Sequence, residues 1–316
     1  MRYGWILFLI LILGFIFWGD IQPWFESLSE EIKDSNGSIL NSVVKEFKNI
    51  DEIEYSISGP TVEELYYSGN KSVTYTYRTY GQPHEVTFTV YDGVNDYLSG
   101  LSRYISYYQN EPTTEDFLLK NIDNEIQIEA IQPFVDFIEE NAETNNEKAR
   151  MAISLVQNIP YDYNGFYGDD LNSKYAYEVL YTNTGVCGEK SELLIHLLRE
   201  LGFGVAYLNF DSQSHAAVGI KCSEEYDYLD SGYCFVESTV PSMITDDQGD
   251  YIDTGKLTEV EEIIIVSNGL SLTDVKEDYN DAIRLNQIQA MGLFLDMSTY
   301  NEWENLIDKY GIIVGE

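Results

Sequence analysis

The chain has 316 residues, enough for one large domain or two smaller ones, and its 44% hydrophobic and 23% charged residues exclude disordered, collagen-like and low-complexity proteins. Asp and Glu number 54 against 18 Lys and Arg, which gives a formal net charge of -36. A surface this acidic repels phosphate backbones, so nucleic acid is excluded as a partner.

The first element is an apolar run from Tyr3 to Gly19 that carries no charged residue. Its seventeen residues reach the lower limit for spanning a bilayer, and Arg2 before the run predicts a cytoplasmic amino terminus. No small-x-small cleavage pattern follows the run, which argues against a removed signal peptide. We therefore expect residues 1–20 to be a single transmembrane anchor in the cell membrane, with the rest of the chain on the extracytoplasmic side.

Two regions follow in which apolar residues recur with different periods. Residues 21–52 are expected to form a helical stalk, because apolar residues recur at helical spacing from Ile39 to Phe47. Within residues 53–120, SVTYTYRTY and EVTFTVY alternate β-branched or aromatic residues with polar ones around the turn GQPH. This pattern predicts an antiparallel hairpin, with His84 in its turn, in a β-rich amino-terminal region.

Residues 121–256 are expected to hold the core. Helical apolar stripes run through residues 128–158, and a loop rich in Asp, Asn, Gly and Tyr follows. After it, leucines from Leu193 to Leu201 predict a helix that starts near Cys187 and ends at Gly202. Residues 257–316 are expected to add a strand and a terminal helix that close the fold, without chemistry of their own.

Cys187 stands at the predicted amino terminus of this helix. Unpaired N–H groups and the helix dipole stabilise a thiolate there, so the position suits a nucleophile. The charge of Glu189, two residues on, partly opposes this effect. The competing interpretation is a buried cysteine that packs in the core.

A nucleophilic thiol needs a base, and the chain has three histidines. His196 lies nine residues along the same helix, roughly 13 Å up its axis and on the opposite side, so it does not reach Cys187. His215 remains as the candidate. It opens the strand HAAVGIKC, in which Ala217 and Gly219 leave room beside the ring.

Glu237 lies in the following strand, YCFVESTVP, and is the candidate acid that orients the imidazole of His215. A hairpin register with these two residues directly opposite each other would bring them together. A disulfide between directly opposite Cys222 and Cys234 needs a register shifted by two pairs, so the two pairings conflict unless a bulge separates them. These patterns do not decide whether Cys222 and Cys234 form a disulfide. If it forms, one thiol is left free.

The segments GVCGEKSELLIHLLRELG, SHAAVGIKC and YCFVESTVP together resemble the transglutaminase-like superfamily over residues 160–245. The resemblance implies an α+β fold with a papain-like core, in which a nucleophile helix packs on an antiparallel sheet. It also implies a triad of Cys187 as nucleophile, His215 as general base and acid, and Glu237 as orienting acid. The chain looks like the prokaryotic membrane-attached branch rather than the animal crosslinking enzymes. One departure is the acid, which is usually Asp in the animal enzymes, although Glu is one methylene longer and can still reach the imidazole.

The chemistry that the resemblance implies is that of an acyltransferase or peptidase acting on peptide or glutamine carboxamide bonds, with a peptide or protein substrate and no metal or cofactor. The backbone N–H of Cys187 would hold the oxyanion, and Tyr161, Tyr163 and Asn164 are candidates for the second donor. Neither a zinc site nor calcium binding by the acidic loop from Asp246 to Asp253 has the expected ligand spacing. The alternatives are a catalytically inactive binding or scaffold module at the cell surface and a structural envelope protein.

Overall fold

The computed structural model describes residues 59–108, 110–168, 173–251, 255–258, 260, 262–292 and 294–313. The chain divides into two units, Met1–Gly59 and Pro60–Glu316, and every element described below belongs to the second unit. The predicted anchor and stalk lie outside the described residues.

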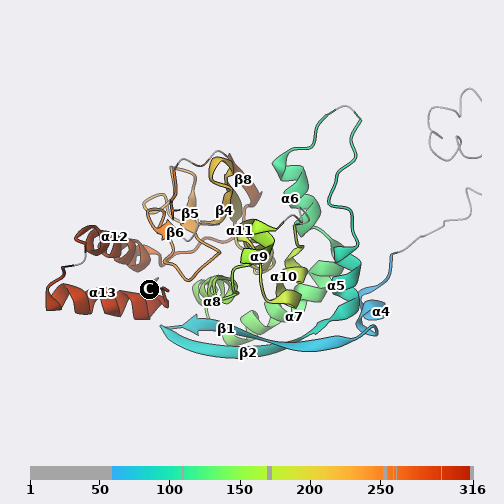
Figure 1. Ribbon diagram of the computed structural model, residues 1–316, viewed down its shortest axis with the longest axis horizontal. Helices are drawn as coiled ribbons and strands as arrows, with labels where there is room; N and C mark the ends of the chain where they lie inside the picture. The colour runs from blue at the N-terminus through green and yellow to red at the C-terminus, as the bar shows by residue number, and fades with distance from the viewer. Residues whose placement is uncertain are drawn as a thin grey trace, which may run out of the picture. The chain divides into compact units, whose positions relative to one another are not determined.

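Helices and strands come in blocks along the second unit: a helix, a pair of strands, a run of helices, a run of strands and a final pair of helices (Figure 1). The helices are α4 (Val62–Tyr66), α5 (Asp92–Ser99), α6 (Thr114–Ile122), α7 (Glu125–Asn141), α8 (Asn145–Gln157), α9 (Tyr163–Tyr167), α10 (Ala176–Thr182), α11 (Cys187–Glu200), α12 (Lys276–Ala290) and α13 (Met297–Tyr310), with the short 3-10 helix η1 (Asp211–Gln213). The strands are β1 (Asn70–Thr79), β2 (Gln82–Tyr91), β3 (Val205–Phe210), β4 (His215–Lys221), β5 (Tyr233–Val236), β6 (Asp250–Tyr251), β7 (Gly255–Lys256) and β8 (Glu262–Ser267).

A four-stranded antiparallel sheet with the strand order β5-β4-β3-β8 lies at the centre of this unit. Helix α11 packs on β3 and β4, and α6, α7, α8 and α10 contact α11 in turn. The hairpin β1–β2 packs against α8 and α10, so that these helices lie between the hairpin and the four-stranded sheet (Figure 1).

The main core runs from the β1–β2 hairpin through the helices to the four-stranded sheet, and one part of it lies between α11 and that sheet. The helical side of this part is the predicted leucine stripe, whose fully buried members are Leu193, Leu194, Leu197 and Leu198. The sheet contributes alternating β-branched residues, which are Val205, Val218, Ile220 and Val236. Complete burial of one leucine side chain contributes roughly 1.5–3 kcal/mol. This packing therefore holds the start of α11 at a constant position relative to β4.

The expected antiparallel hairpin is present, and β1 pairs with β2 from Asn70 opposite Tyr91 to Thr79 opposite Gln82. Its turn lies at Tyr80 and Gly81, whose φ angles are 50° and 76°. Two left-handed residues in a row match the twist of a tight hairpin. The prediction that His84 lies in the turn is wrong, because His84 is paired in β2 and stacks on Tyr77 with 5.3 Å between ring centroids.

The predicted fold class needs correction. The described unit is α+β, but within the described ranges no helix is sufficiently long and apolar to cross a membrane. Even α11, which is buried along most of its length, carries Glu189, Lys190 and Glu192. The transmembrane helix in the fold prediction was placed at Tyr3–Gly19, which lies outside the described residues.

The region predicted to be β-rich is mixed where the structure describes it. Helices α4, α5 and α6 flank the β1–β2 hairpin. Local capping explains two of them, because Thr61 with Glu64 and Thr113 with Asp116 form reciprocal capping boxes at the starts of α4 and α6. The alternating pattern in the hairpin strands carried no information about these short helices.

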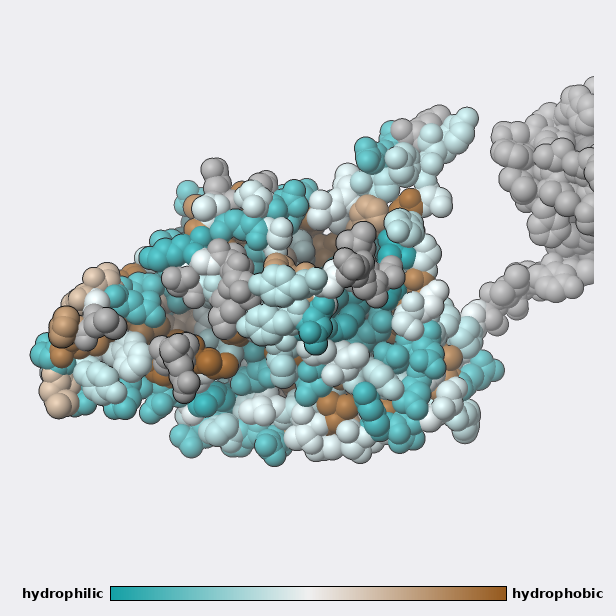
Figure 2. All heavy atoms as spheres, viewed as in Figure 1, coloured by the Kyte–Doolittle hydropathy of each residue, from teal (hydrophilic) through white to brown (hydrophobic). Residues whose placement is uncertain are grey.

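The face of the molecule drawn in Figure 2 is mostly hydrophilic, in keeping with the acidic composition. Exposed apolar side chains occur where α12 and α13 join, including Phe294, which is 97% exposed, and Met297, which is 75% exposed. The helix pair itself buries a separate small core that contains Leu285, Ile288 and Leu306.

Candidate active site

The start of α11 is set by the segment that precedes it. Asn183 ends α10 in the left-handed conformation, and Gly185 forms a parallel bridge with Tyr161. Val186 is the N-cap residue of α11. The helix therefore begins at Cys187, as predicted, and the backbone N–H groups of its first turn point away from the helix.

Glu189 caps this helix. Its carboxylate accepts hydrogen bonds from the N–H groups of Val186 at 3.0 Å and Lys174 at 2.8 Å, and it lies 3.9 Å from the Lys174 ammonium. Burial raises the pKa of Glu189, and the hydrogen bonds oppose that rise only in part. The predicted opposition of Glu189 to a thiolate at Cys187 is weakened accordingly.

The thiol of Cys187 faces the start of β4. Cys187 is 8% exposed, and its Sγ lies 3.6 Å from the carbonyl oxygen of Ser214. Ser214 has a φ of 50°, and this left-handed residue turns the chain from η1 into β4. His215 follows directly, and its side chain hydrogen-bonds with the side chain of Cys187.

The imidazole of His215 lies between two partners. Its Nε2 is 2.9 Å from Oε2 of Glu237, which leaves Nδ1 for the thiol of Cys187. His215 is 4% exposed and Glu237 is completely buried. The structure thus brings together the three residues that the sequence proposed, in the order thiol, imidazole, carboxylate.

Both oxygens of the Glu237 carboxylate accept hydrogen bonds. Its Oε1 accepts hydrogen bonds from the N–H of Ser238 at 2.9 Å, the N–H of Thr239 at 2.8 Å and the hydroxyl of Thr239 at 2.6 Å. Oε2 remains for His215. A carboxylate held on one oxygen by three donors presents the other in a constant direction.

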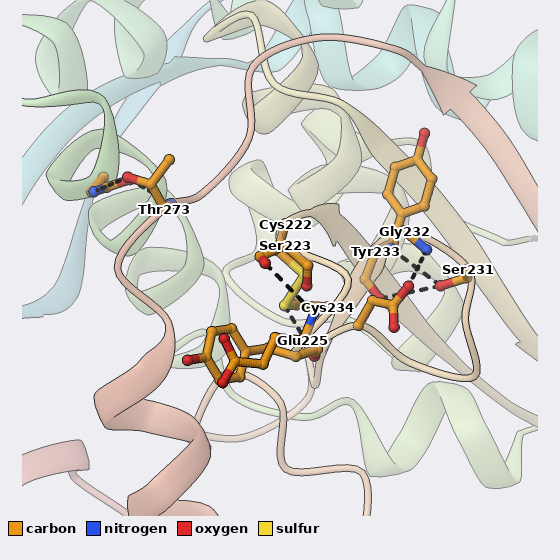
Figure 3. The surroundings of a disulfide bond; sticks show 11 residues. Cys222, Ser223, Glu225, Ser231, Gly232, Tyr233, Cys234 and Thr273 are labelled. Atoms are coloured by element: carbon orange, nitrogen blue, oxygen red, sulfur yellow. Dashed lines mark hydrogen bonds between the residues drawn. A yellow bond between two sulfur atoms is a disulfide. The ribbon is translucent and has the colours of Figure 1, made fainter.

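The register between β4 and β5 differs from both registers considered in the sequence. Val218 pairs with Val236 and Ile220 with Cys234, which is halfway between them. In this register Cys222 is a diagonal neighbour of Cys234, and the two form a disulfide with 5.7 Å between their Cα atoms (Figure 3). Glu237 follows the last paired residue of β5, Val236, and its carboxylate reaches His215 from just beyond the paired residues.

The predicted conflict between the disulfide and the His215–Glu237 pair is therefore wrong, and no bulge is needed. The prediction considered only directly opposite residues, whereas diagonal neighbours on one face of a hairpin also come within reach. The disulfide forms in a register without a bulge, the His215–Glu237 contact forms just beyond the last paired residues, and Cys187 is the free cysteine.

Burial and hydrogen bonding act in opposite directions on the histidine. Burial by itself would lower the pKa of His215, but the hydrogen bonds to Cys187 and Glu237 and the negative charge of Glu237 outweigh it and raise the pKa from 6.5 to about 10. Burial would raise the pKa of Glu237, and its bonds to His215 and Thr239 lower it overall. At neutral pH the pair is an imidazolium beside a carboxylate.

Aromatic side chains enclose the imidazole. The ring of Tyr251 stacks on His215 with 6.2 Å between centroids and 11° between planes, and Phe210 lies 6.0 Å away. The Tyr251 hydroxyl donates to the carbonyl of Asp246. Sequence reasoning missed Tyr251, because it stands 36 positions after His215 in the acidic loop from Asp246 to Asp253, which was considered only for calcium binding.

The three candidates for a second oxyanion donor have different positions. Tyr161 pairs with Gly185, close to the start of α11. Tyr163 and Asn164 lie in the exposed helix α9, where Tyr163 is 44% exposed. The bridge places Tyr161 beside Gly185, two residues before Cys187, and the second oxyanion donor stays unassigned.

The remaining polar candidates have other surroundings. His196 is completely buried in α11, and burial together with the charge of Arg199 lowers its pKa to about 4. Within the described ranges, no cluster of three His, Cys, Asp or Glu side chains is arranged to hold a metal ion. In the acidic loop, Asp246 accepts a hydrogen bond from Asn286 at 2.9 Å.

Comparison with known proteins adds little to this geometry. No protein-family model matches the chain, and no curated protein matches it. One solved structure, described as a putative protease from Parabacteroides distasonis, is 16% identical with a TM-score of 0.31, over 62% of this chain and 41% of that chain. A likeness this weak is compatible with a protease-like protein and carries no argument, so the resemblance to the transglutaminase-like superfamily stays a prediction.

Proposed function

We propose that this protein is a cysteine acyltransferase or peptidase that acts on peptide or glutamine carboxamide bonds. Cys187 is the nucleophile, His215 the general acid and base, and Glu237 the residue that orients the imidazole. The observation that carries the proposal is the position of His215, hydrogen-bonded to the thiol on one side and to a buried, fully bonded carboxylate on the other.

The resting state in this proposal is a thiolate beside an imidazolium. The raised pKa of His215 keeps its ring protonated at neutral pH, and a protonated imidazole beside a thiol stabilises the thiolate. The first-turn N–H groups of α11 add to this effect. When the imidazolium gives up a proton it gives up the one on Nδ1, because Glu237 holds the Nε2 proton.

The reaction begins when the Cys187 thiolate attacks the carbonyl carbon of the substrate. Negative charge develops on the carbonyl oxygen, and in this proposal the backbone N–H of Cys187 donates to it. The carbon–nitrogen bond then breaks as His215 transfers its proton to the leaving amine, which leaves a thioester. Neutral His215 next accepts a proton from water or from a second amine, which attacks the thioester and releases the acid or a new amide.

The substrate in this proposal is a peptide or a protein, as the resemblance implies. The Cys222–Cys234 disulfide supports an extracytoplasmic location, because such bonds persist in oxidising compartments and are rare in the cytosol. In such a compartment the unpaired Cys187 needs a reason to stay reduced, and a role as nucleophile supplies one.

Alkylation of Cys187 with iodoacetamide tests the proposal directly. We expect the second-order rate constant at pH 6.5 to stay within about tenfold of that at pH 8.5, whereas a model thiol with a pKa of about 8.5 loses most of its thiolate over this range. The variant His215→Ala should lose the reactivity at pH 6.5. Peptide mass spectrometry identifies the modified cysteine.

The control is His84→Ala, since His84 lies in β2 and stacks on Tyr77. A slow reaction at pH 6.5 that is the same in His215→Ala would reject the enzyme and leave the inactive binding module as the function to test. Thermal stabilisation by candidate peptides would then be the measurement.

A further inference from the structure

Lys190 is the most unusual buried charge near the site. It has no exposed area, and its ammonium donates to three backbone carbonyls: Ile159 at 2.5 Å, Thr239 at 2.6 Å and Gln157 at 3.4 Å. Burial lowers its pKa to about 7, although the charge of Glu237 opposes the fall. A lysine without a carboxylate partner in hydrogen-bond contact is expensive to bury, so its position calls for a function.

The carbonyl of Thr239 connects Lys190 to the acid of the site. Thr239 gives Glu237 two of the three hydrogen bonds on Oε1, through its N–H and its hydroxyl. Lys190 holds Thr239 from the opposite side, through the carbonyl. The lysine and the carboxylate thus fix the same residue, and any shift of Thr239 changes the direction in which Glu237 meets His215.

A second contact of the same kind stands one residue further along α11. The hydroxyl of Ser191 lies 2.9 Å from the hydroxyl of Ser238 and donates to the carbonyl of Ala216 at 3.2 Å. Ser238 in turn donates to the carbonyl of Cys187 at 3.5 Å. Because positions three and four residues apart share one face of a helix, Lys190 and Ser191 lie on the same face as Cys187.

The end of α8 completes the arrangement. Gln157 donates through Nε2 to the carbonyl of Glu237 at 2.9 Å, while its own carbonyl accepts from Lys190. Lys190 therefore bridges two segments that meet only in the folded protein, the α8 end and the loop after β5. Both segments contact Glu237 or its neighbours.

We propose that Lys190 is a positioning residue that ties the Glu237–Thr239 loop to the nucleophile helix, so that the carboxylate stays aimed at His215. The inference rests on the proposed function of the Cys187–His215–Glu237 set. It does not place Lys190 in contact with substrate. Ser191 supports the same loop through Ser238.

A double-mutant cycle on the rate of Cys187 alkylation at pH 6.5 tests this. Lys190→Met and Glu237→Gln should each slow the reaction at least tenfold. The variant carrying both substitutions should be no more than about twofold slower than Glu237→Gln alone, because a residue that acts through Glu237 has nothing left to position. The rate at pH 9, where thiols ionise without help, should change less in every variant.

The matched control is His196→Gln, which alters another completely buried polar residue of α11 outside the contacts with the loop. Its alkylation rate at pH 6.5 should match the wild type. Lys190→Gln serves as the second variant, since its side-chain amide can still donate a hydrogen bond but carries no charge. Circular dichroism and a thermal melt confirm that each variant is folded.

Two results would overturn the inference while the proposed function stands: Glu237→Gln slows alkylation but Lys190→Met does not, or the two effects multiply in the double variant. Failure of both Lys190 variants to fold would assign the lysine a purely structural role and would overturn it as well. If Glu237→Gln and His215→Ala themselves have no effect, the proposed function is what fails.

Discussion

At the scale of single residues, the site is defined by how each buried polar atom is satisfied. Glu237 is completely buried, and both of its oxygens have partners. Removing one partner from a buried ion pair typically costs about 3–5 kcal/mol, because the remaining charge is left uncompensated. The His215–Glu237 pair is therefore a rigid feature, and the protonation state of the imidazole follows from it.

The charge state of His215 gives a prediction that NMR can check. Its pKa is raised from 6.5 to about 10, so the stability it contributes is complete below pH 6.5 and is lost as the pH rises through 10. With three histidines in the chain, 15N-labelled imidazoles can be followed individually. One ring should keep the imidazolium pattern at pH 9 and should lose it in Glu237→Gln.

Global stability is a poorer readout of the same effect. Lys190 has a lowered pKa, so between about pH 7 and 10.5 its contribution to stability rises with pH, opposite in sign to that of His215. The imidazole spectrum isolates one group. The assignment is contradicted if no ring keeps the imidazolium pattern at pH 9.

At the scale of elements, the β4–β5 hairpin has two functions that depend on one register. The pairing of Val218 with Val236 puts Cys222 and Cys234 on a diagonal and places Glu237, the next residue after Val236, within reach of His215. A slip of one residue would turn every side chain of β5 to the other face of the sheet. The disulfide at one end of the hairpin thus also protects the contact at the other end.

Removal of the disulfide should destabilise the protein. The bridge closes a loop across 12 positions, and cross-linking a loop of this length stabilises the folded state by about 3 kcal/mol in the chain-entropy model. We expect the double variant Cys222→Ala/Cys234→Ala to lose an amount of that order in urea unfolding. The single variant Cys187→Ser is the control, and equal losses in both would contradict the prediction.

At the scale of the whole molecule, charge is the dominant property. The formal net charge is -36, and the candidate site lies inside this acidic protein with its own charges paired. Excess charge of one sign destabilises a compact state through self-repulsion. Arginine contacts offset some of this locally, as where both terminal nitrogens of Arg150 bond the buried Asp278 and join α8 to α12.

Screening of the charge should therefore stabilise the fold. The Debye length is about 30 Å at 0.01 M salt and about 10 Å at 0.1 M, so raising NaCl over this range removes most of the long-range repulsion. We expect the melting temperature at pH 7 to rise by at least ~2 °C, which corresponds to roughly 1 kcal/mol for a protein of this size. At pH 4, where many carboxylates are protonated, the increase should shrink, and a melting temperature that falls with salt at pH 7 would contradict the prediction.

Local patterns explain how much of the site could be predicted. The leucine stripe and Gly202 place a helix from Cys187 onward, and alternation identifies β4 and the β1–β2 hairpin. Each of these patterns involves residues only a few positions apart, so it can be recognised in the sequence alone. The hairpin turn was predicted at GQPH, but it lies at Tyr80 and Gly81. Tyr80 adopts a left-handed φ, which a tyrosine in the sequence does not indicate.

The sequence by itself determined the types of the three candidate site residues and the helix and strand that present Cys187 and His215. Only the tertiary structure decided the register between β4 and β5, the hydrogen bonds from Thr239 to Glu237 and the burial of Lys190. The carbonyl partners of Lys190 lie 31 to 49 positions away from it in the sequence, and the hydrogen bond from Gln157 to Glu237 joins residues 80 positions apart. Such contacts form when α8, α11 and the sheet pack around one core, and no periodicity within a single segment encodes them.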